Sequence, residues 1–411
     1  MSTVTAPPAG GTPDPDETPP TTWAARVTRH LDAAGIVTPI ITAILAFLIG
    51  GLVVLATGED PISTYRAIFE GTGLQWLFPW VTGDDRSLAA INLQQTLLLT
   101  CPLILTGLAV ALAFRAGLFN IGGQGQYIAG SAAAVWVASS WTGMPGLPHI
   151  LLAIAAAMAG GAVWGGIAGL LRATTGANEV ITTIMLNWIA VWVGVYLFAI
   201  GGPLQNETDR DLPVSPDIAA NTHLPVFWGD PELQGLHIGI FVALLSAVLF
   251  WLLMRRSARG YEARAVGLNP EAARYGGIHV GRTYVWVMAL CGLLAGLAGS
   301  LDILGWQFRL ATNDIQTSQI GYLGIAVALL GRNTAAGTCI GALLFGALLQ
   351  GTSVRNLDPE IFRPDLADNL TRIIQGLIIL FVAADFLVAW FWQRRRGRRM
   401  ARSEAQAGGA A

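Results

Sequence analysis

Lysine is absent from this chain of 411 residues, so all 24 of its basic side chains are arginines. A Walker A loop binds nucleotide phosphates with a lysine, and without one the chain is not a P-loop ATPase. Charge of either sign is also scarce, because only 12% of the residues are charged, about half of what soluble domains contain. With 53% hydrophobic residues and a mean hydropathy of +0.55, the sequence predicts a membrane protein.

Cysteine is nearly absent as well, and the three cysteines, Cys101, Cys291 and Cys339, lie far apart inside apolar segments. Their spacing fits neither a metal site nor a disulfide framework, so we expect no metal ligands here. The sequence contains no HExxH motif, nucleophile elbow or pair of catalytic carboxylates, and we therefore expect no enzyme activity.

Apolar runs recur along the chain, and a run of about 20 residues crosses the hydrocarbon core as a helix. They predict an all-α polytopic protein of about ten passes, although the two shorter runs, the eighth and ninth, also fit a re-entrant pair. The runs are Ile36–Ala56, Leu93–Phe114, Leu118–Val137, Leu147–Leu171, Val180–Ile200, Leu236–Met254, Tyr284–Leu304, Ile320–Leu330, Thr338–Leu349 and Ile373–Trp392.

Three parts follow from this pattern. Residues 1–35 are proline-rich, and we expect disorder followed by a short interfacial segment. Residues 36–392 form the transmembrane domain, and residues 393–411 an arginine-rich tail that fits topology or anionic lipid better than nucleic acid. Arginines gather on one side of the predicted spans, while the loops at 57–92 and 201–235 are acidic, so we place both termini in the cytosol.

The longest polar segment on the cytosolic side, residues 255–282, carries six arginines and a strong helix signal. Asn269 is a good N-cap, Pro270 suits the first helical position and Glu271 favours the positive end of the helix dipole. We expect a short helix that ends at Gly276–Gly277 and that another protein can grip. Its candidate coupling residues are Asn269, Pro270, Glu271, Ala272, Ala273, Arg274 and Gly277.

Amide and hydroxyl side chains interrupt the third and fifth apolar runs. The third contains Asn120, Gln124 and Gln126 among glycines, and the fifth places Thr183 and Asn187 on one helix face. Either a discontinuous helix lines a path for a polar solute, or the amides hydrogen-bond across closely packed helices. We take these five residues as candidates for a translocation path. A second interruption, near Gly331, is typical of an internally repeated transporter, although sequence identity between the halves is not strong.

Four stretches resemble one family in order along the chain. They are EAA within RAVGLNPEAARYGGI, FNIGGQGQ, ANEVITTIMLN and IAVALLGRN. These resemble the permease subunits of bacterial ABC importers in the branched-chain amino acid, ribose and nucleoside class, nearest to the nucleoside and simple-sugar subgroup. The EAA segment of that family is a coupling helix.

The resemblance implies a multi-pass subunit of the bacterial cell membrane that imports a nucleoside or related simple sugar. Its partners would be an ATPase that carries ATP and Mg²⁺, a second permease that is a homologue or a copy, and an extracellular solute-binding lipoprotein. Permeases for ribose or branched-chain amino acids are the nearest alternatives.

Two other classes stay open. A proton-coupled secondary transporter would use Asp385 or Glu179 as its titrating group, since a carboxylate inside a span suggests function. A channel or scaffold would need no energy coupling. Asp302 lies near the outer end of the seventh span, where Trp306 and Gln307 are candidates for an outer gate or a docking surface. For Trp306, anchoring at the membrane interface is the favoured role.

Overall fold

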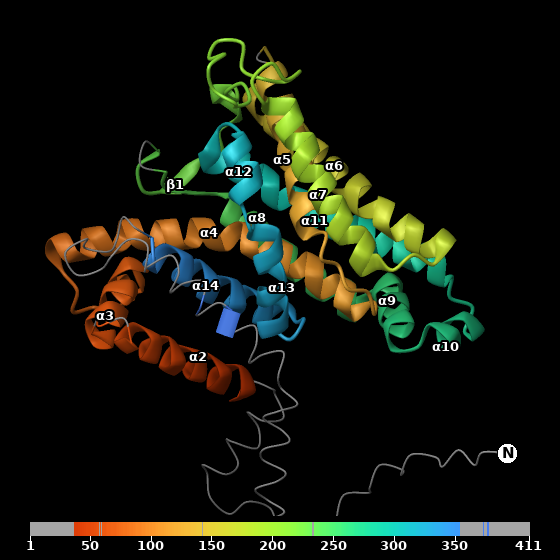
Figure 1. Ribbon diagram of the computed structural model, residues 1–411, viewed down its shortest axis with the longest axis horizontal. Helices are drawn as coiled ribbons and strands as arrows, with labels where there is room; N and C mark the ends of the chain where they lie inside the picture. Colours follow the sequence, from red (N-terminus) through yellow and green to blue (C-terminus); the bar gives the residue numbers. More distant parts are fainter. Residues whose placement is uncertain are drawn as a thin grey trace, which may run out of the picture.

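The computed structural model describes residues 37–353 except 57, 59, 142, 232 and 233, together with 373, 376 and 377. This part is a helical bundle with one short antiparallel hairpin, so the all-α prediction is confirmed in its main feature (Figure 1). The first-half helices are α2 Val37–Ala56, α3 Pro61–Gly71, α4 Gly83–Arg115, α5 Gly123–Ser140, α6 Gly146–Thr175 and α7 Glu179–Phe198. The second half has α8 Gly239–Arg256, α9 Ala258–Leu268, α10 Pro270–Tyr275, α11 Val280–Asp302, α12 Thr312–Thr317, α13 Ile320–Leu330 and α14 Ala335–Gly351. The hairpin strands are β1 Val226–Trp228 and β2 Leu236–His237, and shorter turns are η1 Leu74–Leu77, η2 Ala220–Thr222 and η4 Ile303–Gln307.

Five helices of the described part are long and apolar enough to cross a membrane: α4, α6, α7, α8 and α11 with η4. The helix α14 is apolar but shorter, and α13 has 11 residues, which is about 16 Å and half the hydrocarbon thickness. The runs at 320–330 and 338–349 therefore form two short helices joined by a turn. The last predicted span, 373–392, lies almost entirely outside the described residues, and the count of ten passes stays a prediction.

Three predicted boundaries are wrong. The third span was expected from residue 118, but α5 begins at Gly123 and continues unbroken to Ser140, so the irregular backbone precedes the helix rather than interrupting it. The region 57–92 is not a loop, because it contains α3, η1 and the first ten residues of α4. In the sixth span the hairpin strand β2 comes first, and α8 begins only at Gly239.

The helix α4 lies at the centre of the bundle, where α8, α11, α13 and α14 pack against it. Most of its apolar stretch is buried inside the protein, as is most of α11. Residues buried on all sides of a spanning helix make it a core helix, whereas α6 and α7 keep broad exposed faces. The site described below lies where α5, α7 and α13 meet beside this core.

Glycines allow α6 and α11 to cross with their backbones in contact. A Cβ atom added at Gly161 would lie 2.1 Å from the carbonyl oxygen of Gly292. One added at Gly296 would lie 2.2 Å from the carbonyl oxygen of Ala157. Gly161 and Gly165 repeat at four-residue spacing, as do Gly292 and Gly296, which is the small-residue pattern of packed membrane helices.

Gly161→Val should therefore separate α6 from α11 and destabilise the protein by about 3 kcal/mol or more, because rigid backbone faces the added methyl groups. We expect little folded protein and a lowered thermal midpoint after purification in detergent. Gly166→Val is the matched control, since a Cβ there meets only the Ala289 methyl group at 3.8 Å. Equal stability of the two variants would contradict the assignment of this crossing.

Candidate functional site

The helix predicted in the segment 255–282 is present as α10. The Asn269 side chain accepts a hydrogen bond from the Ala272 amide at 3.1 Å, which confirms Asn269 as the N-cap. Pro270 occupies the first helical position. The helix ends at Gly276, and Gly277 follows with φ +82°, a conformation that glycine adopts without strain.

The segment contains a second helix, α9, which was not predicted from the sequence. Ser257 caps it by accepting from the Gly260 amide at 2.9 Å, so a serine N-cap was the available signal. Contact between the backbones of Gly267 and Gly117 anchors α9 to the bundle. A small core of Val266, Ala273 and Val280 then holds α10 against α9 and the start of α11.

The outer surface of α9 and α10 is unusually exposed. The side chains of Leu268 and Tyr275 are 88% and 93% exposed, and the two helices lie at the right-hand edge of the bundle in Figure 1. Glu271 and Arg274 form an exposed ion pair at 3.8 Å beside them. Large apolar tips that project from a polar surface are typical of a docking face for another protein.

The structure brings the five candidate path residues together in one buried cluster, and each is 1% exposed. Asn120 and Gln126 exchange two amide hydrogen bonds of 3.2 Å, and Asn120 Oδ1 also accepts from the Gly122 amide at 2.9 Å. The irregular residues before α5 are therefore held by side chains on their own segment.

Asn187 joins this segment to α7. Its Oδ1 accepts from the Gly125 amide at 2.8 Å, and its Nδ2 donates to the Ile121 carbonyl at 2.9 Å and to Tyr322 Oη at 3.3 Å. Thr183 lies one turn earlier, and its hydroxyl donates within α7 to the Glu179 carbonyl at 2.7 Å. Tyr322 completes the cluster from α13, and no local pattern predicted this contribution.

The beginnings of α5 and α13 meet beside these amides. Gln124 Oε1 accepts from the Gly321 amide at 2.9 Å, and a Cβ added at Gly321 would lie 2.2 Å from the Gln124 nitrogen. Within the described part of the chain, Gln124 Nε2 is buried without a hydrogen-bond partner. In this arrangement the amides bridge closely packed helices, as one interpretation of the sequence expected, and the cluster is closed. Whether it opens onto a solute path stays a prediction.

Two carboxylates predicted near the spans are both engaged. Glu179 lies in the first turn of α7, which Asn178 caps, and it pairs with Arg172 at 3.4 Å. Asp302 is 1% exposed and accepts from Tyr127 Oη at 2.6 Å and from Trp306 Nε1 at 3.2 Å. Trp306, in the π-helical turn η4, thus binds a buried acid at the end of α11. Asp385 lies outside the described residues.

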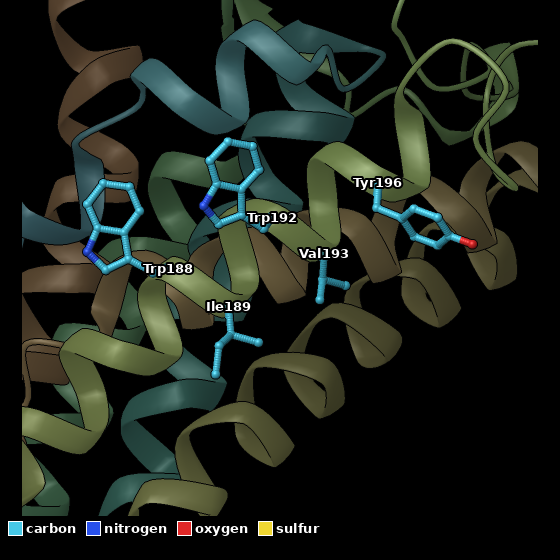
Figure 2. A pocket seen from close by; sticks show the side chains of 5 residues that line it. All are labelled: Trp188, Ile189, Trp192, Val193 and Tyr196. Carbon is cyan, nitrogen blue, oxygen red and sulfur yellow. The ribbon is translucent and has the colours of Figure 1, made fainter.

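The opposite face of α7 is aromatic and points away from the bundle (Figure 2). Trp188, Ile189, Trp192, Val193 and Tyr196 line a shallow groove of about 400 Å³ there. Trp188 and Trp192 lie near the middle of α7, although tryptophan in spanning helices gathers at the membrane interfaces. This face is open to lipid or to another subunit.

Comparison with known proteins decides the family. A family model described as the permease component of the branched-chain amino acid transport system matches residues 92–383, which is most of the chain. The chain belongs to this family. It is accordingly a transport subunit and not an enzyme, and its apolar helices make it a multi-pass membrane permease.

Three known proteins are similar in sequence to this chain over most of its length. The guanosine ABC transporter permease protein NupP of Bacillus subtilis is 37% identical over 350 residues, covering 85% of this chain and 93% of NupP. The nucleoside ABC transporter permease protein NupB of Lactococcus lactis is 33% identical, with 86% and 92% covered. The glucose ABC transporter permease protein TsgB13 of Haloferax volcanii is also 33% identical, with 87% and 89% covered.

Proposed function

We propose that this chain is the membrane permease of an ABC importer and that its solute is a nucleoside. The observation that carries the proposal is the match to NupP and NupB along nearly their whole length. A simple sugar is the second candidate, because the glucose permease TsgB13 is as similar to the chain as NupB is. Nucleosides and sugars both present ring hydroxyls, which neutral amide and hydroxyl side chains bind well.

ATP and Mg²⁺ bind to a partner ATPase in this proposal, and the ATPase docks on α9 and α10. Support comes from the capped α10 helix and from the exposed apolar side chains of Leu268 and Tyr275, which an interface with another protein would bury. A second permease and an extracellular solute-binding lipoprotein complete the importer in the bacterial plasma membrane. Ten passes with both termini in the cytosol fit the arginine placement.

Asn120, Gln124, Gln126, Thr183 and Asn187 line the translocation path in its closed state. Closure follows from their burial, and opening would separate the beginnings of α5 and α13, which meet at backbone contact. Gln124 Nε2 has no hydrogen-bond partner in the described part of the chain, and this supports the role, because an unpaired buried donor costs stability that a solute oxygen would recover. A proton-coupled mechanism is less favoured, since Glu179 is already paired with Arg172.

Uptake of radiolabelled guanosine, glucose, ribose and branched-chain amino acids, in cells with and without the gene, tests this proposal. We expect deletion of the gene to reduce the rate of nucleoside uptake tenfold or more. The uptake in cells that keep the gene should depend on ATP and not on the proton gradient. Loss of glucose or ribose uptake instead would keep the ABC importer and change its solute. Uptake that disappears when only the proton gradient is collapsed would overturn the energy source.

A further inference from the structure

A small cavity lies between α5, the turn η4 and the segment that joins α12 to α13. Its volume is about 20 Å³. That space accommodates one oxygen atom with its hydrogens, such as a water molecule or a single hydroxyl group. The lining residues are Tyr127, Ile128, Ser131, Gln307, Leu310, Asp314, Ile315 and Ser318.

Three polar atoms of the residues that line this cavity make no hydrogen bond of good geometry within the described part of the chain, although the Ser131 and Gln307 side chains lie close enough to interact with the Tyr127 hydroxyl. They are Ser131 Oγ, Gln307 Oε1 and Ser318 Oγ, and all three are buried. Ser131 as a whole is 1% exposed. Buried polar atoms in folded proteins are nearly always hydrogen-bonded, so three orphans around one small space indicate that an occupant belongs there.

The chemistry of the wall suits a neutral hydroxyl group. Ser131 and Ser318 each offer a hydroxyl donor, and Gln307 Oε1 accepts. The Tyr127 hydroxyl donates a hydrogen bond to Asp302 Oδ2 at 2.6 Å, so in any further hydrogen bond its oxygen can only accept. Trp306 Nε1 donates to the other oxygen of Asp302. Both oxygens of this carboxylate therefore have a donor, and neither needs a hydrogen bond from an occupant of the cavity. An occupant must therefore both donate and accept, as a hydroxyl does.

The cavity lies along the same contact between α5 and the segment before α13 as the amide cluster does. On α5, Gln124 and Ser131 are seven residues apart and share a helix face, with Tyr127 between them. On the facing segment, Ser318 comes three residues before Gly321, whose amide donates to Gln124 at 2.9 Å. Asp314, an exposed residue of α12, also lines the cavity, so only part of one helix separates the cavity from the protein surface.

We propose that this cavity is a hydroxyl subsite of the translocation path and that it receives one hydroxyl of the solute's sugar ring. The inference rests on the proposed function and adds a solute group and the residues that recognise it. Before the solute arrives, a water molecule makes the same hydrogen bonds. A ring hydroxyl replaces that water and keeps its hydrogen bonds. A ring that lacks this hydroxyl leaves the serine and glutamine oxygens of the wall without hydrogen bonds.

Uptake by the complete importer in cells tests the subsite. The substrates are the transported solute, guanosine or glucose, and its analogues that each lack one ring hydroxyl. Ser131→Ala and Ser318→Ala are compared with the wild type. We expect each substitution to slow uptake of the full solute about fivefold, the effect of one neutral hydrogen bond. For one analogue, the same substitutions should leave uptake unchanged, and that analogue identifies the bound hydroxyl.

Comparing variant with wild type for each solute cancels the preference of the solute-binding protein. Ser140→Ala is the matched control on α5, because the Ser140 hydroxyl donates only to the Trp136 carbonyl at 2.6 Å and is exposed. An equal loss for all analogues would mean that the cavity holds a structural water only, and unchanged uptake of every solute would also overturn the subsite. A wild type that transports neither nucleoside nor sugar would overturn the proposed function itself.

Discussion

Glu271→Arg is expected to abolish uptake and to release the partner ATPase while the permease stays folded. Glu271 lies in the first turn of α10 with a side chain 75% exposed, so its replacement disturbs no core contact. The lost pair with Arg274 is a surface ion pair, and such pairs contribute about 1 kcal/mol or less. Reversal of charge in the proposed docking face is expected to cost far more, because an arginine buried there without an acidic partner loses its hydration.

Three measurements separate docking from folding in this variant: thermal unfolding of the permease, co-purification of the ATPase, and ATP-dependent uptake. Gly277→Trp is an independent second variant. Open space surrounds Gly277, but its φ of +82° strains any other residue and alters the end of α10. The matched control is Glu207→Arg, which makes the same charge change at an exposed position of the 201–235 segment. Wild-type uptake by Glu271→Arg would eliminate α10 as the coupling helix.

Local signals predicted α10 well because each acts within a few residues. The Asn269 cap, the proline at the first position and the terminal glycines mark the two ends of this helix, and the core around Ala273 then holds it in place. The apolar runs likewise located α2, α6, α7 and α11 to within a few residues. Hydrophobicity of a continuous segment is likewise a local property, which the sequence displays directly.

The helix start at Gly123 could not be predicted in the same way. Residues 118–122 belong to the third apolar run, yet Asn187 from α7 binds the backbone of Ile121, and that contact joins residues 66 positions apart. The hydrophobic pattern also failed at α3 and the start of α4. Gly73 packs there against the backbone of Leu93, so tertiary contacts rather than local apolarity hold that region.

The candidate path residues were chosen one by one as polar groups in apolar runs, and the structure places all five together. What the sequence could not supply was the other half of the cluster. Gly321 lies 197 residues from Gln124, and Tyr322 lies 135 residues from Asn187. Both look like ordinary span residues in the sequence. The orphan atoms around Ser131 are equally invisible in sequence, because a missing hydrogen bond is a property of packed atoms.

Asn187→Leu should be the most damaging substitution in the amide cluster. Leucine has a similar volume but leaves the Gly125 amide and the Ile121 carbonyl unpaired, since both now bind Asn187. Each unpaired buried group costs roughly 1–3 kcal/mol, so we expect the free energy of unfolding to fall by roughly 2–6 kcal/mol. Thermal unfolding in detergent and uptake in cells should both decline, and unchanged stability would contradict the role of Asn187 as the link between α5 and α7.

Thr183→Val separates the packing role of this face from a role in transport. The Thr183 hydroxyl donates only to the backbone of its own helix, to the carbonyls of Glu179 and Val180, so its removal strands no donor on another segment. Stability should therefore change by less than about 1 kcal/mol. If the cluster opens onto the solute, uptake should nevertheless fall about fivefold, because the valine methyl group cannot replace the hydrogen bond. Full uptake together with full stability would assign the polar face of α7 to packing alone, and the solute would then pass elsewhere.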